Sequence, residues 1–197
     1  MIQPSLFGND FSTLLSSDQG HVSYFRNAIS PDKSSRWFAY FFENIAWQAE
    51  RRQMYERELE VPRLHAHFLL ADGVPSLLGE AFNLVIGYFD TPFDSVGLNL
   101  YRNEHDSVAP HNDKLEFLQA GQPIALLSLG ATRRMVIRQK KTPHRRLNVD
   151  LESGSLLLMS WSSQLHYDHG IPKERDRVGP RISLAFRVRN TSQRRTE

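Results

Sequence analysis

The first half of the chain carries apolar residues at helical spacing. Large apolar residues recur three and four positions apart from Trp37 to Ile45, and Ser30-Pro31-Asp32 in front of them is a typical helix start. The same spacing predicts a second helix over 73–88, and the segment 61–70 between the two predicts a strand. We expect the aromatic face of the first helix to pack on a sheet; stacking on nucleic-acid bases is the alternative use.

After residue 90 the apolar period changes to two, which predicts β-strands separated by glycine and proline turns. The predicted strands are 96–102, 124–129, 133–139, 147–151, 155–160, 164–169 and 181–189. Helices followed by many short strands predict a mainly β chain with flanking helices (α+β), in which a sandwich or barrel is buttressed by two N-terminal helices.

The 197 residues suggest one domain over 1–197. We divide it into an N-terminal arm (1–30), a helical, substrate-facing segment (31–90) and a β core (96–189). The segment 48–60 is either a helix end or an exposed hairpin. A short helical turn or a packed arm would use the apolar residues Phe7, Phe11, Leu14 and Leu15.

The absence of cysteine excludes disulfides and thiolate-bound metals, so any metal must take histidine and carboxylate ligands. The chain has no run of the roughly 20 apolar residues that a bilayer span needs. Its first ten residues lack the basic start and apolar run of a secretion signal. We therefore expect a soluble, cytoplasmic monomer without membrane or disulfide partners.

Basic charge is concentrated in one segment. The net charge is +2, and removing seven basic residues between positions 131 and 146 leaves the rest at −5. These seven are Arg133, Arg134, Arg138, Lys140, Lys141, Arg145 and Arg146, and no acid lies among them. Such a segment fits sequence-independent phosphate contacts, and a solvated hairpin is the alternative.

The last predicted strand separates apolar from polar residues cleanly. One face carries Arg181 and Arg187 with the small residues Ser183 and Ala185 between them. Two guanidinium groups separated by small side chains suit a pocket for a short dianion. A solvated outer face fits the same pattern, and the strand alone leaves both interpretations open.

His111 and Asp113 stand two residues apart on an extended segment, so their side chains point the same way. They supply two thirds of the 2-His-1-carboxylate set that holds non-haem Fe(II). Either His166 or His169 could complete it, and we favour His169 because Gly170 lets the backbone turn beside a metal.

Asn99 and Tyr101 share a strand face, and their amide and phenol suit the oxygens of a bound acid. A half-buried strand tyrosine is the alternative for Tyr101.

Taken in order, these segments resemble the AlkB family of Fe(II)- and 2-oxoglutarate-dependent dioxygenases over about residues 78–189. The resemblance is carried by Asn99-Leu100-Tyr101, His111-Asn112-Asp113, His169-Gly170-Ile171 and the run from Pro180 to Arg187. Ser128-Leu129-Gly130 and Gly154-Ser155-Leu156-Leu157 are similar to core strands of the family.

The resemblance implies a double-stranded β-helix (jelly roll) with a catalytic Fe(II) bound by His111, Asp113 and His169. Arg181, helped by Tyr101, would pair with the distal carboxylate of 2-oxoglutarate. Arg187 and Asn99 would lie near the end of 2-oxoglutarate that binds iron, and Ser183 would line the same site. The family reaction consumes O2 and 2-oxoglutarate, oxidises an N-alkyl group on a base, and releases succinate, CO2 and aldehyde.

The chain departs from the family pattern near the substrate. Family members that repair bases usually carry an acid two residues after the metal aspartate, where this chain has Leu115, followed by Glu116. The lid segment before Asn99 is shortened, and Ser183 replaces an asparagine common in the last strand. The first two departures concern the substrate, and the third concerns the fit of the co-substrate.

The expected substrate is alkylated DNA or RNA, with the target base flipped out of its stack. His111 and Phe68 are candidates to stack on that base, with Leu115 and Glu116 nearby. Phosphate contacts are expected from Arg133, Arg134, Arg138, Lys140 and Lys141. One alternative keeps the chemistry on a protein, RNA or small-molecule substrate, because Leu115 and the lid differ. A less favoured alternative is a non-catalytic jelly-roll binding module.

Overall fold

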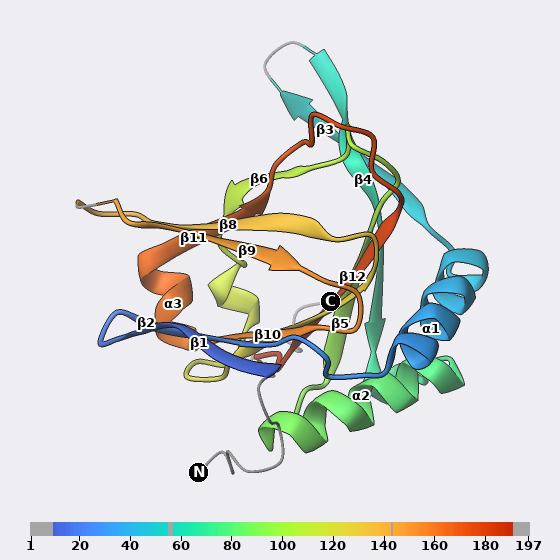
Figure 1. The fold of residues 1–197 in the computed structure, drawn as a ribbon, viewed down its shortest axis with the longest axis horizontal. Coiled ribbons are helices and arrows are strands. Elements are labelled where there is room, and N and C mark those ends of the chain that lie inside the picture. The colour runs from blue at the N-terminus through green and yellow to red at the C-terminus, as the bar shows by residue number, and fades with distance from the viewer. Residues whose placement is uncertain (1–9, 55–56, 143, 191–197) are drawn as a thin grey trace.

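Two antiparallel β-sheets face each other, and two helices cover the outer side of the larger sheet (Figure 1). This computed structural model describes residues 10–54, 57–142 and 144–190. The eight-stranded sheet has the order β1 (Phe11–Ser17), β2 (Gly20–Phe25), β10 (Leu156–Met159), β7 (Ile124–Gly130), β12 (Arg181–Arg187), β5 (Ser95–Tyr101), β4 (Arg57–Leu69) and β3 (Gln48–Met54). The four-stranded sheet has the order β6 (Val108–His111), β11 (Tyr167–Ile171), β8 (Arg133–Gln139) and β9 (Arg146–Leu151).

From β5 to β12 the chain passes repeatedly between the two sheets. Strands β5, β7, β10 and β12 belong to the larger sheet, and β6, β8, β9 and β11 to the smaller one. This alternation is the double-stranded β-helix that the sequence resemblance implies, so the expected fold class is confirmed.

The helices form where the sequence predicts them. Helix α1 (Pro31–Asn44) begins after Ser30, whose hydroxyl accepts a hydrogen bond from the Lys33 amide, and it buries Trp37 and Phe41. These aromatic side chains therefore pack on the sheet and do not serve for base stacking. Helix α2 (Ser76–Phe89) buries four residues at the spacing of one helical face, Leu78, Ala81, Phe82 and Val85.

Two apolar cores result, one between the helices and the larger sheet and one between the two sheets. Strand β12 separates them by alternation, because Ile182, Leu184 and Phe186 belong to the helix-side core and Ala185 to the inner core. Arg181 is also on the inner face of β12, where it lines the same pocket as the inner-core residue Ala185. The polar face of the last strand therefore points into the molecule, and the solvated alternative is wrong.

The described part of the arm takes the packed-arm alternative, as the hairpin β1–β2, in which β2 pairs with β10 and Leu14 and Leu15 pack against the inner core; Phe7 lies outside the described residues. Two other parts of the chain differ from the prediction. Residues 161–166 form the short helix α3 (Trp161–His166), capped by Ser160, so the strand predicted from 164 begins only at Tyr167. Strand β6 was not predicted.

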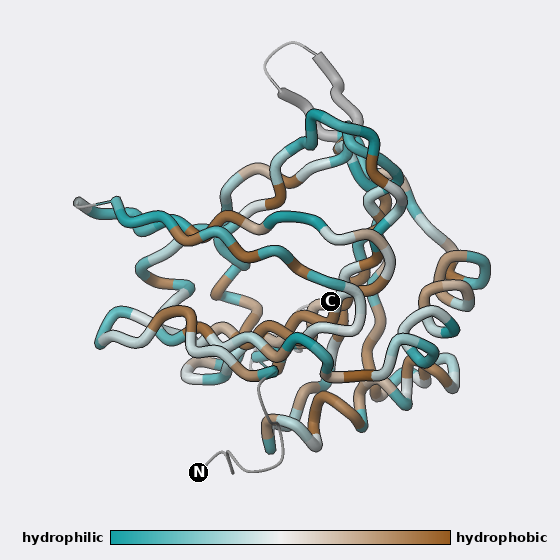
Figure 2. The backbone as a smooth tube through the Cα atoms, viewed as in Figure 1, coloured by the Kyte–Doolittle hydropathy of each residue, from teal (hydrophilic) through white to brown (hydrophobic). Residues whose placement is uncertain are grey.

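The segment 48–60 takes the hairpin alternative, as the antiparallel pair β3–β4. A second hairpin, between β8 and β9, projects from the smaller sheet, and the described residues near its outer end are hydrophilic (Figures 1 and 2). Within the described ranges, every helix is too short or too polar to cross a membrane.

Candidate metal centre and co-substrate pocket

The candidate metal ligands come from two neighbouring strands and the turn that follows one of them. His111 ends β6, and Asp113 stands two residues further on. His169 lies in β11, directly opposite His111 in the antiparallel register, and the centres of the two imidazole rings are 4.6 Å apart. One ligand atom from each of His111, Asp113 and His169 lies within 4.8 Å of the others. The structure therefore brings together the three predicted ligands and selects His169 as the second histidine.

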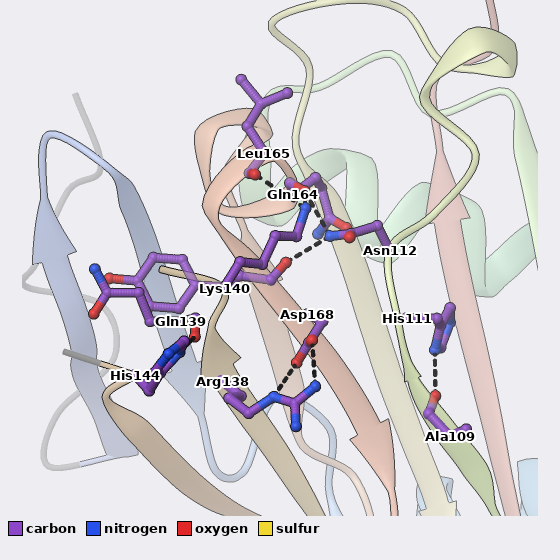
Figure 3. Close-up of polar contacts among 11 residues, drawn as sticks. Ala109, His111, Asn112, Arg138, Gln139, Lys140, His144, Gln164, Leu165 and Asp168 are labelled. Atoms are coloured by element: carbon purple, nitrogen blue, oxygen red, sulfur yellow. Dashed lines mark hydrogen bonds and ion pairs between the residues drawn. The ribbon is translucent and has the colours of Figure 1, made fainter. Parts of the chain in front are cut away.

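Hydrogen bonding and burial prepare both imidazoles as ligands. The Nδ1 of His111 donates to the carbonyl of Ala109 at 2.9 Å, which leaves Nε2 free to bind a metal (Figure 3). His169 is buried, and this burial, together with the neighbouring His111, lowers the pKa of His169 to about 4. His169 is therefore neutral at pH 7, as a metal ligand must be.

The carboxylate is held by an arginine from the opposite sheet. Arg187 of β12 donates to Asp113 through Nε at 2.9 Å and Nη2 at 3.2 Å. Burial raises the pKa of the Asp113 carboxyl, but the Arg187 guanidinium, together with the two neighbouring histidines, keeps that pKa below its usual value. Two imidazoles and one ionised carboxylate, with room beside them, fit Fe(II).

Arg187 was expected beside the iron-binding end of the co-substrate. It lines the same pocket as the ligands, and its direct partners are Asp113 and the carbonyl of Ala185. Gly97 on the adjacent strand gives it room, since a Cβ there would lie 3.1 Å from Nη1.

Arg181 has the properties of an anion-binding residue. It is 1% exposed, and its Nη2 donates to the Ser128 hydroxyl at 2.9 Å. Its Nε and Nη1 find no acceptor of suitable geometry in the described structure. Burial lowers the pKa of Arg181 to about 10, so it still carries a positive charge at neutral pH. Buried donors without partners are costly, and the carboxylate of 2-oxoglutarate would satisfy them.

One pocket contains both the metal ligands and Arg181. Tyr101 lies opposite Arg181 in the β5–β12 register, and Asn99 lies opposite Ser183. These four residues all line the pocket, as the sequence predicts. Tyr101 is 3% exposed, so it is a fully buried tyrosine and not a half-buried one.

Sequence reasoning missed Arg63. It lines the pocket from β4, and its Nε donates to the Asn99 side-chain oxygen at 2.9 Å. The Asn99 oxygen is therefore already engaged within the protein. Alternation along β4 was the available signal, because Arg63, His65 and His67 share the face opposite the apolar residues.

Two of the predicted substrate contacts have other roles. Phe68 lies in the helix-side core, because the alternation of β4 turns His67 towards the inner face instead. Leu115 is in a short 3-10 turn and packs against the inner core, whereas Glu116 beside it is exposed.

The predicted phosphate-binding residues fall into two groups. Arg133 is fully buried, so its expected contact with nucleic acid is wrong. It shares its strand face with Met135 and Ile137, which lie in the inner core. The other four, Arg134, Arg138, Lys140 and Lys141, are exposed on β8 and the hairpin that follows it.

Comparisons with known proteins agree with this geometry. Residues 69–187 match the family model of the 2OG-Fe(II) oxygenase superfamily. The chain is 34% identical over 154 residues to the bovine alpha-ketoglutarate-dependent dioxygenase alkB homolog 3, covering 73% of this chain and 50% of that protein. It is 34% identical over 132 residues to the bovine DNA oxidative demethylase ALKBH2, covering 64% of this chain and 44% of that protein. The chain thus spans about half the length of these curated relatives.

Solved structures show the same fold. OsALKBH1 superimposes with a TM-score of 0.58 at 16% identity, over 84% of this chain and 97% of that one. The non-heme alpha ketoglutarate dependent epimerase SnoN superimposes with a TM-score of 0.59 at 13% identity, over 85% of this chain and 76% of that one.

The sequence resemblance to AlkB proteins is thereby confirmed. The match over 69–187 covers more than half of the chain and contains the three ligands and the buried Arg181. The chain belongs to the 2OG-Fe(II) oxygenase superfamily.

Proposed function

We propose that this protein is an oxidative dealkylase of alkylated nucleic-acid bases that uses Fe(II), 2-oxoglutarate and O2. The observation that carries the proposal is the single pocket in which the ligand set and the buried, partly unsatisfied Arg181 lie together. Bound iron would supply the oxidation of an N-alkyl carbon, coupled to conversion of 2-oxoglutarate into succinate and CO2, after which the product loses an aldehyde.

The protein residues contribute binding, charge and exclusion of water. Arg181 fixes the distal carboxylate of 2-oxoglutarate, and Ser128 fixes the Arg181 guanidinium. Arg187 keeps Asp113 ionised, and burial keeps His169 neutral, so neither ligand must lose a proton when the metal binds. The inner core around the pocket keeps these charges out of bulk water, where their interactions would be weaker.

The outer side of the smaller sheet supports a nucleic-acid substrate. A hollow of about 300 Å³ lies behind the strands that carry the histidine ligands, with an apolar floor that includes Val136 and Ile171. Three basic residues, Arg138, Arg146 and Lys173, line it, and Arg138 is paired with the carboxylate of Asp168. The hydrophilic β8–β9 hairpin continues this surface with Lys141 and Arg145 (Figure 2). Cations beside an apolar hollow suit a phosphate backbone and its bases.

The names of the relatives point the same way, since one of them is a DNA oxidative demethylase. The test is formaldehyde release and base restoration on methylated DNA and RNA oligonucleotides, supplied with Fe(II) and 2-oxoglutarate. Succinate formation with other substrates, without formaldehyde or repair on any oligonucleotide, would reject the nucleic-acid substrate while keeping the oxygenase chemistry.

The basic hairpin can be tested separately. Lys141→Glu with Arg145→Glu should raise the KM for oligonucleotides at least tenfold and weaken its dependence on salt. Arg36→Glu, on the far side of the molecule in α1, is the matched control and should leave KM unchanged. Equal effects of the hairpin and control variants would show that the hairpin does not bind the substrate.

A second candidate is the same chemistry on a protein side chain, an RNA or a small molecule. Leu115 favours it, because this apolar side chain packs on the inner core where an acid would contact a base. A panel of alkylated DNA, RNA and peptides separates the candidates through the rate of 2-oxoglutarate turnover. The cytoplasmic location, the monomeric state and the single domain stay predictions.

A further inference from the structure

Asn112 stands between two metal ligands and points away from the metal. Its side-chain nitrogen donates to the backbone carbonyls of Gln164 and Tyr167, each at 2.5 Å (Figure 3). Both acceptors belong to the junction between α3 and β11, just before His169. One amide side chain therefore connects the turn that carries His111 and Asp113 to the segment that carries the third ligand.

The backbone alone does not make this connection. The pairing of β6 with β11 has an irregularity and ends at His111, opposite His169. Asp113 lies beyond the last ladder position, so the sheet does not fix it. Its position depends on Arg187 from the opposite sheet and on the neighbouring Asn112.

Lys140 reaches the same carbonyl from the basic hairpin. Its Nζ donates to the Gln164 carbonyl at 3.1 Å and to the Leu165 carbonyl at 3.0 Å (Figure 3). Its backbone amide donates to the His166 carbonyl at 2.9 Å. These carbonyls end α3 and need donors that the helix cannot supply. Lys140 therefore fixes the end of the helix to which Asn112 is bonded.

We propose that Asn112 is a positioning residue of the metal centre and that Lys140 supports it through the shared Gln164 carbonyl. Together they hold the three ligands at their mutual distances before a metal binds. Lys140 thus has a structural role that its neighbour Lys141 lacks, because among the described residues no side-chain hydrogen bond or ion pair joins Lys141 to α3.

The test uses Mn(II) as a redox-stable probe and electron paramagnetic resonance to measure free and bound metal. Asn112→Leu keeps the side-chain size and removes both donors. It should weaken Mn(II) binding by roughly 10- to 100-fold, the usual effect of losing a group that orients ligands. The spectrum of the bound Mn(II) should also broaden, because the ligand geometry is no longer uniform. Wild-type affinity and line shape in this variant would overturn the proposal.

Lys140→Met and Lys141→Met form a matched pair with the same loss of charge. We expect the first to weaken Mn(II) binding about three- to tenfold, as an indirect version of the same effect, and the second to change it less than twofold. The double variant Asn112→Leu/Lys140→Met should lose less affinity than the product of the single losses, because both residues act on one carbonyl. Equal affinities in the matched pair would remove Lys140 from the proposal.

If the melting curve of Asn112→Leu shows that this variant does not fold, the test rests on the matched pair Lys140→Met and Lys141→Met, because both lysines are exposed. The measurement needs no organic substrate. Metal binding without dealkylation of any oligonucleotide would therefore reject the proposed function and leave this proposal intact.

Discussion

Two fully buried arginines flank one tyrosine ring, and they differ in how many of their donors the protein satisfies. The guanidinium of Arg133, from the smaller sheet, lies 5.6 Å from the centre of the Tyr101 ring, and that of Arg181, from the larger sheet, lies 5.3 Å from it. Arg133 donates to the carbonyls of Asn103, Asp106 and Pro172, with donor–acceptor distances between 2.7 and 3.1 Å. Its Nε makes no hydrogen bond of suitable geometry, but it lies 3.4 Å from the Glu174 carboxylate in an ion pair.

Arg181 donates to the hydroxyl of Ser128 and also interacts with the Tyr101 phenol, but two of its nitrogens lack an acceptor of suitable geometry among the described residues. The comparison shows that burial of a guanidinium does not identify its role. Arg133 uses its donors to join two loops, whereas Arg181 keeps donors available for a ligand.

The largest expected effect follows from removing Arg133. Arg133→Met leaves three carbonyls without their donor and Glu174 without its partner, so the free energy of unfolding should fall by about 3–5 kcal/mol. Denaturant unfolding followed by circular dichroism measures it. Arg134→Met, at the exposed neighbour paired with Asp150, is the control and should have a much smaller effect, because an exposed ion pair contributes little to stability. Equal losses would mean that Arg133 is not the connection between the loops.

Removing Arg181 should affect binding far more than stability. Arg181→Met should raise the KM for 2-oxoglutarate roughly 100-fold or more, because two charge-assisted hydrogen bonds are worth about 1.5–3 kcal/mol each. Its melting temperature should stay close to that of the wild type, since an apolar side chain replaces a poorly satisfied cation. A KM within threefold of the wild-type value would contradict the assignment of the pocket.

The Tyr101 phenol reports on both arginines. Burial raises the pKa of Tyr101 above its ordinary value of 10, and the charges of Arg181 and Arg133 oppose that rise, with Arg181 the stronger. Removing either arginine should therefore raise this pKa further, and Arg181→Met should raise it more. Absorbance titration of each variant, with and without Tyr101→Phe, isolates this phenolate.

The raised pKa of Tyr101 also makes the stability of the folded protein depend on pH. The folded protein keeps the Tyr101 proton at pH values where the unfolded chain loses it, so stability should fall as pH rises above 10. Tyr101→Phe should flatten that decline, and an unchanged slope would contradict the burial argument.

The smallest effect is expected at Ser128. Ser128→Ala removes the hydroxyl that orients Arg181, and the KM for 2-oxoglutarate should rise about two- to tenfold through the loss of one hydrogen bond to a charged group. Steady-state kinetics measures the change, and Ser155→Ala serves as a control because that buried serine bonds to the Glu152 carbonyl outside the pocket. Equal effects on KM would show that the hydroxyl does not act through Arg181.

Alternation along the strands made much of the site predictable. Period-two patterning in β5 and β12 placed Asn99, Tyr101, Arg181 and Ser183 on shared faces, and the register confirms that they meet. The same pattern placed Arg133 and Arg134 on the two different faces of β8. The apolar residues Met135 and Ile137 on the Arg133 face indicate that this face is buried.

Other features depend on contacts between distant segments, which local patterns do not contain. Strand β2 buries Val22, Ser23 and Tyr24 in succession, so both of its faces are covered and no alternation is visible. The bond between Arg63 and Asn99 depends on the register of β4 against β5. Helix α3 has six residues, too few for a periodic signal.

The passage of the chain between two sheets also determines how ligands act on stability. The metal ligands belong to the smaller sheet and the turn beyond it, whereas Arg181 and Arg187 belong to the larger one. A molecule held by both groups is bound only while the sheets stay together. Metal and co-substrate should therefore slow hydrogen exchange across the whole β core, including amides far from the pocket, as ligands do when the opening that releases them is global.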